Sequence, residues 1–124
     1  MYKLFLLIGT AASALSVAIG AFGAHALKDL LKANGRADVF ETAVKYQFYH
    51  SFAILFIGVL LLLKGDNKTL EWAGWAFATG IIVFSGSLYI LALTNVGKWG
   101  AVTPIGGTLF IAGWIMALIA VCKF

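Results

Sequence analysis

The chain has 124 residues, a formal net charge of +4, 62% hydrophobic residues and only 11% charged residues. This composition lies far outside the range of soluble globular domains and indicates an integral membrane protein. The basic residues lie at the ends of apolar runs, where such residues anchor helices to headgroups, so nucleic acid is not an expected partner. A single cysteine, Cys122, allows neither an internal disulfide nor a cysteine metal cluster.

Four apolar runs are long enough to cross a membrane, which takes about 20 helical residues. They cover residues 4–24, 46–63, 72–93 and 104–122, and none contains Asp, Glu, Lys or Arg. The runs lack the alternation of a β-barrel, so we expect helices that satisfy their own backbone groups. We predict one all-α domain over residues 1–124, a four-helix bundle that crosses the cell membrane several times. We also expect the first run to be retained as a helix, not cleaved as a signal peptide.

A short amphipathic segment separates the first two runs. Residues 25–33 read H-A-L-K-D-L-L-K-A, which places three leucines on one helical face and Lys28, Asp29 and Lys32 on the other. This pattern predicts a short helix that lies in the membrane interface. Asn34 and Gly35 should end it, because both tolerate the left-handed conformation.

Polar residues also predict where the later helices begin. Asp38 and Glu41 have the spacing of a capping box, which predicts a helix start at Asp38. Glu41 and Lys45 are four residues apart and should form an ion pair outside the hydrocarbon. Thr103 followed by Pro104 is typical of an N-cap and first helical position.

Polar side chains within the runs gather toward the end of the bundle that carries the short helix. Gln47, His50 and Ser51 share one helical face, which must turn toward the bundle because lipid offers no hydrogen bonds. We expect His25 to cap the end of the first helix and to form hydrogen bonds in this cluster. The candidate residues are His25, Gln47, His50, Ser51, Ser85, Ser87, Tyr89, Thr103 and Thr108.

Two interpretations of this cluster remain open. The side chains either bond to one another and fix the helices in register, or line a shallow pocket in one leaflet. Two histidines without a carboxylate make a poor metal site, and no catalytic motif is present, so we expect no metal, no cofactor and no enzymatic activity. Separately, four basic residues near the short helix are candidates for binding an anionic headgroup: Lys28, Lys32, Arg36 and Lys45.

Four stretches resemble one family: GAFGAHALK at residues 20–28, YQFYH at 46–50, FSGSLYILALT at 84–94 and TPIGGTLFIAGW at 103–114. They are similar to the DUF423 family, small bacterial membrane proteins of the YwdK and YgdD type that are related to a small eukaryotic transmembrane protein. The resemblance implies a four-helix membrane protein with no established activity. It marks His25, Lys28, Tyr46, Gln47, His50, Ser85, Ser87, Tyr89, Thr103, Pro104 and Gly106.

The resulting hypothesis is a non-enzymatic membrane protein that packs helices or binds a lipid headgroup, a small amphiphile or a partner in one leaflet. The partners expected are membrane lipids, a second copy of the chain or another membrane protein. The alternative is a small oligomeric channel or carrier, which would need a continuous polar path through both leaflets.

Overall fold

The computed structural model describes residues 1–124 and contains five α-helices and one short 3₁₀ helix. Their bounds are α1 Tyr2–His25, α2 Lys28–Asn34, α3 Ala37–Lys64, α4 Lys68–Thr94, η1 Gly97–Ala101 and α5 Thr103–Cys122. The four long helices are apolar enough to cross a membrane, and each predicted apolar run lies within one of them. The all-α prediction of four long helices and one short helix is confirmed.

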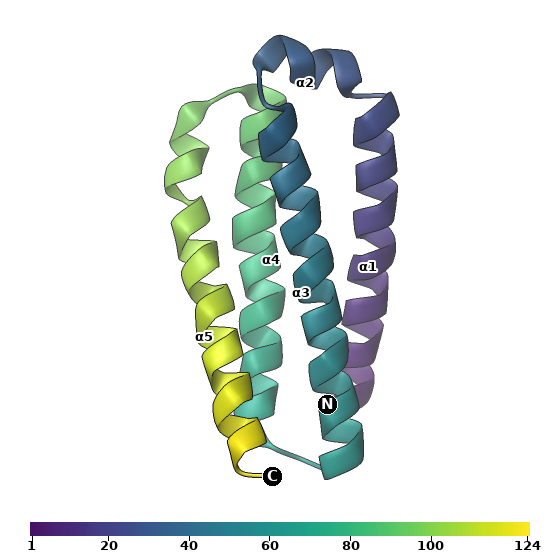
Figure 1. The fold of residues 1–124 in the computed structure, drawn as a ribbon, viewed down its shortest axis with the longest axis vertical. Coiled ribbons are helices and arrows are strands. Elements are labelled where there is room, and N and C mark those ends of the chain that lie inside the picture. Colours follow the sequence, from purple (N-terminus) through teal and green to yellow (C-terminus); the bar gives the residue numbers. More distant parts are fainter.

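The long helices run alternately up and down, with short connections (Figure 1). Along the bundle α1 packs on α3, α3 on α4 and α4 on α5. Helix α2 lies across one end of the bundle, and both chain termini lie at the opposite end (Figure 1). We refer to these as the α2 end and the terminal end.

The centre of the bundle is filled by apolar side chains from all four long helices. Phe5, Ile54, Ile57 and Phe77 are fully buried, and Phe110 is nearly so. Close packing of these side chains leaves the middle of a single bundle without an open path.

Small residues allow the helices to approach one another, as expected where lipid tails are as apolar as leucine. A Cβ atom added to Gly9 would stand 2.6 Å from Leu55 Cγ, so α1 and α3 are in direct contact there. A Cβ atom on Gly106 would stand 2.6 Å from Phe84 Cα, so α5 lies against the backbone of α4. No side chain larger than hydrogen fits at Gly106 without movement of a helix.

The helix ends agree with the sequence at some points and correct it at others. Gly35 ends α2 in the left-handed conformation, with φ of 66°, as predicted. Helix α3 begins at Ala37 with Arg36 as its N-cap and no side-chain cap, so the Asp38–Glu41 capping box was wrong. The turn at Gly35 starts the helix early and leaves Asp38 inside the first turn. Thr103 likewise is the first residue of α5 and not its N-cap.

Candidate functional site

Gln47 joins three helices, α1, α3 and α4. Its Nε2 donates to the carbonyl oxygen of Ala12 in α1 at 3.2 Å, and its Oε1 accepts from the Tyr89 hydroxyl of α4 at 2.5 Å. Ser51 donates to the Gln47 carbonyl at 2.6 Å. Gln47 is only 5% exposed, and both polar atoms of its amide form hydrogen bonds within the protein.

Two serines of α4 form further bonds between helices toward the α2 end. The Ser85 hydroxyl donates to the Ala43 carbonyl of α3 at 2.7 Å. The Ser87 and Thr103 hydroxyls lie 2.6 Å apart and connect α4 with α5. Because both serines are buried, these bonds replace contacts with water that the membrane cannot supply.

His50 is held by contacts on every side of its ring. Its Nδ1 lies 2.8 Å from the Tyr46 carbonyl, and its Nε2 accepts from Trp114 Nε1 at 3.1 Å. The ring stacks on Phe110 with centroids 3.5 Å apart. The tautomer with hydrogen on Nδ1 satisfies both contacts and leaves no free nitrogen for a ligand. Trp114 was not among the predicted site residues. It lies four residues after Phe110, which faces the bundle, and therefore on nearly the same side of α5.

Every buried polar side-chain atom in the structure has a hydrogen-bond partner. The groups on Gln47, His50, Ser85, Ser87, Tyr89 and Thr103 therefore act between helices, whereas Ser51 bonds to a carbonyl of its own helix. None of them is directed into an empty space. This geometry favours the interpretation that they hold the bundle together.

The structure does not bring His25 or Thr108 into this cluster. His25 is exposed, and α1 ends instead with the Ala26 amide donating to the Phe22 carbonyl, so its expected capping role is corrected. Thr108 is exposed and donates to Pro104 of its own helix at 2.9 Å. Thr108 lies two residues after buried Gly106, about 200° around the helix, which turns its side chain away from the bundle.

The terminal end has little hydrogen bonding between helices. Thr10, Ser13 and Thr79 donate only to carbonyls of their own helices, at 2.7 to 3.3 Å. One charged residue at this end is nevertheless buried: Glu71, which pairs with Lys68 at 2.8 Å within α4. Sequence reasoning missed its burial because Glu71 stands just outside an apolar run.

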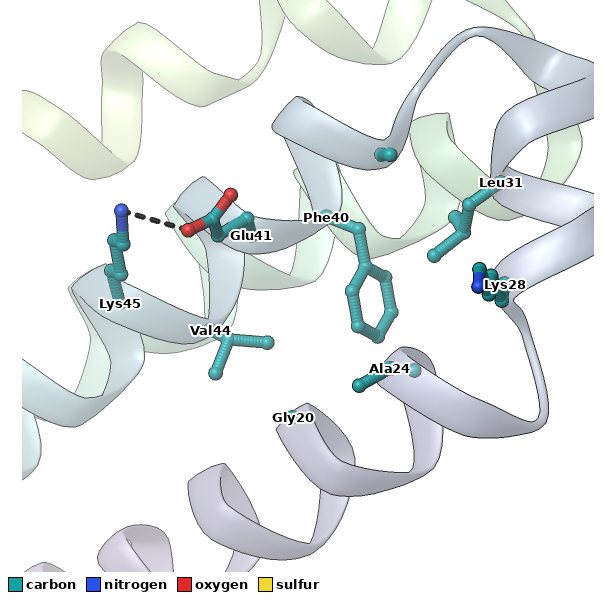
Figure 2. A pocket seen from close by; sticks show the side chains of 10 residues that line it. Gly20, Ala24, Lys28, Leu31, Phe40, Glu41, Val44 and Lys45 are labelled. Carbon is teal, nitrogen blue, oxygen red and sulfur yellow. Dashed lines mark ion pairs between the residues drawn. The ribbon is translucent and has the colours of Figure 1, made fainter.

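A cavity of about 530 Å³ lies at the α2 end between α1, α2 and α3 (Figure 2). Its lining residues are Gly20, Gly23, Ala24, Lys28, Leu31, Ala37, Phe40, Glu41, Val44 and Lys45. None of the predicted polar-cluster residues lines it. Two of the four predicted headgroup residues, Lys28 and Lys45, do, whereas Lys32 and Arg36 do not.

The cavity is formed beside the large ring of Phe40, where Gly20 and Gly23 have no side chain to fill the space. Phe40 of α3 packs against Gly23 of α1, where a Cβ atom would collide with the ring. Beside this contact, Gly20 faces Val44 and contributes no side chain (Figure 2). Leu31, on the buried face of α2, lines the cavity from the α2 side.

Helix α2 is held in place by Asn34, its last residue, and by Arg36 in the turn that follows. Asn34 Nδ2 donates to the Ala92 carbonyl at 3.0 Å, and Arg36 Nε donates to Asn95 Oδ1 at 2.9 Å. The first contact uses a carbonyl near the end of α4 that lacks a partner within the helix. The second joins the turn between α2 and α3 to the side chain of Asn95, the C-cap of α4. Arg36 is therefore committed to the fold and not to the cavity.

Residues 19–107 match the family described as Protein of unknown function (DUF423). The chain belongs to this family. It is similar to UPF0382 membrane proteins of Staphylococcus haemolyticus, at 48% identity, of Staphylococcus aureus strain USA300, at 49%, and of Staphylococcus epidermidis, at 46%. Each alignment covers 98% of both chains. No solved structure matches the chain.

These matches confirm the family resemblance, and with the four long apolar helices they identify a multi-pass membrane protein. The DUF423 match contains every residue that lines the cavity, from Gly20 to Lys45. It ends before Trp114, the hydrogen-bond partner of His50.

Proposed function

We propose that this protein is a non-enzymatic membrane protein that binds an anionic, phosphate-bearing amphiphile in the cavity between α1, α2 and α3. The observation that carries the proposal is a largely apolar cavity at the α2 end of the bundle with lysines from two helices on its lining. An occupant must therefore combine an apolar part with a negatively charged part.

The apolar part of the occupant would contact an apolar lining. Leu31 and Phe40 are buried side chains, and Gly20, Ala24 and Val44 add further apolar surface without a hydrogen-bonding group. Water beside these side chains would lack the two to four polar partners that an ordered buried water needs. A hydrocarbon group fits this lining better than a sugar or a nucleotide would.

The charged part has two candidate donors. Lys28 reaches the cavity from α2, and Lys45 reaches it from α3. Glu41 also lines the cavity and pairs with Lys45 at 3.0 Å (Figure 2). Two positive charges and one negative charge leave an excess of one positive charge. A phosphate group is the natural partner, because ammonium groups bind phosphate through charge-assisted hydrogen bonds.

Native mass spectrometry of the detergent-solubilised protein tests the proposal. The ligands are phosphatidylglycerol and phosphatidylcholine with identical acyl chains. The double variant Lys28→Gln/Lys45→Gln should retain phosphatidylglycerol about tenfold less well than the parent protein, because it loses charge-assisted hydrogen bonds. Binding of phosphatidylcholine should be unchanged, since it carries no net charge.

The matched control is Lys32→Gln/Lys98→Gln, which removes the same charge from residues outside the cavity. This pair should retain phosphatidylglycerol as the parent protein does. An equal loss in both pairs would mean general attraction to the basic surface and would contradict the proposal. Displacement of the lipid by millimolar inorganic phosphate would indicate a phosphate site and not an amphiphile site.

A third variant changes affinity in the opposite direction within the same experiment. Glu41→Gln removes the negative charge and frees Lys45 from its ion pair. Retention of phosphatidylglycerol should rise severalfold, since an exposed ion pair contributes up to about 1 kcal/mol. Weaker retention would contradict the charge argument.

The alternative of a channel or carrier has no specific support from the geometry. The centre of a single bundle is filled by residues such as Ile54, Phe77 and Phe110. The terminal half also lacks the polar lining that a wet passage needs.

A further inference from the structure

We infer that one acyl chain of the bound amphiphile lies in a groove between α1 and α3 that continues from the cavity toward the middle of the membrane. This inference rests on the proposed function and adds which part of the protein holds the chain. It also assigns Gly20 as the residue that joins the headgroup site to the chain site.

The groove has a volume of about 300 Å³ and lies beside the cavity. Three residues, Gly20, Val44 and Lys45, line both spaces. The groove is bordered further by Ser16 and Val17 of α1 and by Phe48 and Tyr49 of α3. A molecule whose phosphate lies near Lys45 can therefore continue past Gly20 without leaving the protein surface.

The groove continues from the cavity along α1 toward the middle of the bundle. Ala24 lines the cavity and Ser16 lines the groove, and they are about two helical turns, or about 12 Å, apart along α1. The groove itself, from Gly20 to Ser16, covers about 6 Å of that distance. It therefore covers part of the path that an acyl chain takes from its headgroup into the bilayer.

The groove is too short to serve as the interface with a second protein. Its lining residues on α1 run only from Ser16 to Gly20, about one helical turn. A stable interface buries about 800 Å² on each partner, which needs a far longer contact along the helices. A flexible chain of methylene groups is the occupant of suitable width in this membrane environment.

No buried polar group of the lining needs an outside partner. The Ser16 hydroxyl, the polar group deepest in the groove, already donates to the Ala12 carbonyl at 2.8 Å. Lys45 lies at the shared mouth, next to its partner Glu41. Below that mouth an apolar chain leaves every hydrogen bond of the protein intact.

Photo-crosslinking in liposomes locates the chain. The probe is phosphatidylglycerol with a diazirine near the middle of one acyl chain, and the control is phosphatidylcholine with the same label. With the anionic probe, crosslinks should be enriched about tenfold at Val17, Phe48 and Tyr49 relative to lipid-exposed Ile82 and Ile111. The control probe should label all exposed positions similarly.

A substitution in the protein provides the second measurement. Gly20→Leu fills the space next to Val44 Cγ1, which a Cβ atom at Gly20 would already approach to 3.1 Å. It should abolish the enrichment, whereas Gly86→Leu, at a position with open space around it, should preserve it. The map on the unsubstituted protein keeps the inference testable if Gly20→Leu does not fold.

The outcomes separate the inference from the proposed function. If phosphatidylglycerol retention depends on Lys28 and Lys45 but crosslinks spread over all exposed faces, the chain site is wrong and the headgroup site stands. If neither lysine dependence nor enrichment is found, both are wrong. Enrichment at the groove that disappears in Lys28→Gln/Lys45→Gln supports both.

Discussion

Replacing Gly106 by alanine is expected to lower the free energy of unfolding by about 1–3 kcal/mol, the usual cost of overpacking. The new methyl group would stand 2.6 Å from Phe84 Cα, and a backbone atom cannot rotate away as a side chain can. Helices α4 and α5 must therefore separate, which also lengthens the nearby Ser87–Thr103 contact. Unfolding by SDS in mixed micelles, followed by circular dichroism, measures the change.

The adjacent glycine provides the control. A Cβ atom at Gly107 would lie 3.9 Å from the Phe84 ring, which is ordinary contact. Gly107→Ala should therefore stay within about 1 kcal/mol of the parent protein, with helix propensity in favour of alanine. If both alanines lower stability equally, the close contact between α4 and α5 is not as described.

The second large effect is expected at Gln47. Gln47→Leu leaves the Tyr89 hydroxyl without its acceptor and should lower the free energy of unfolding by about 1–2 kcal/mol. Tyr89→Phe removes the other partner of the same bond. The double variant should cost less than the sum of the single ones by about 0.6–1.7 kcal/mol, the average and the maximum found for hydrogen bonds between membrane helices.

Exposed Tyr49 provides a matched control for this cycle, because its hydroxyl forms no hydrogen bond to the protein. Tyr49→Phe should leave stability unchanged and should not couple to Gln47→Leu. Strictly additive effects of Gln47→Leu and Tyr89→Phe would show that their contact contributes nothing to the bundle. The interpretation of the polar cluster as a connection between helices would then be wrong.

The fold could be predicted from the sequence because the bilayer permits few solutions. Four apolar runs of sufficient length without charges determine four helices. Gly35 likewise ends α2, since only a left-handed residue makes that turn easily. Helix starts were less predictable, as Asp38 shows, because several polar residues near a turn can occupy the cap position.

Part of the polar cluster could also be predicted from the helical periodicity of the sequence. Gln47, His50 and Ser51 share a face, and all three are buried. The error at Thr108 was avoidable, because Gly106 and Phe110 define the buried face of α5 and Thr108 lies opposite. His25 was not predictable in this way, since its direction depends on the turn between α1 and α2.

The cavity could not be located from the sequence. Gly20 and Gly23 have the spacing of ordinary helix contacts. Only the space beside Gly23 is filled by a large neighbouring side chain, that of Phe40. Which lysines face the space depends on how α2 lies across the bundle. That placement is fixed by contacts of Asn34 and Arg36 with residues almost 60 positions away.

A crystal structure grown from a lipidic phase that contains phosphatidylglycerol tests the central claim most directly. The expected result is lipid density in the cavity, with its phosphate within hydrogen-bonding distance of Lys28 and Lys45 Nζ. One acyl chain should pass Gly20 and reach Ser16. Lipid density only at Lys32 and Lys98, or a cavity closed by its own side chains, would contradict the account.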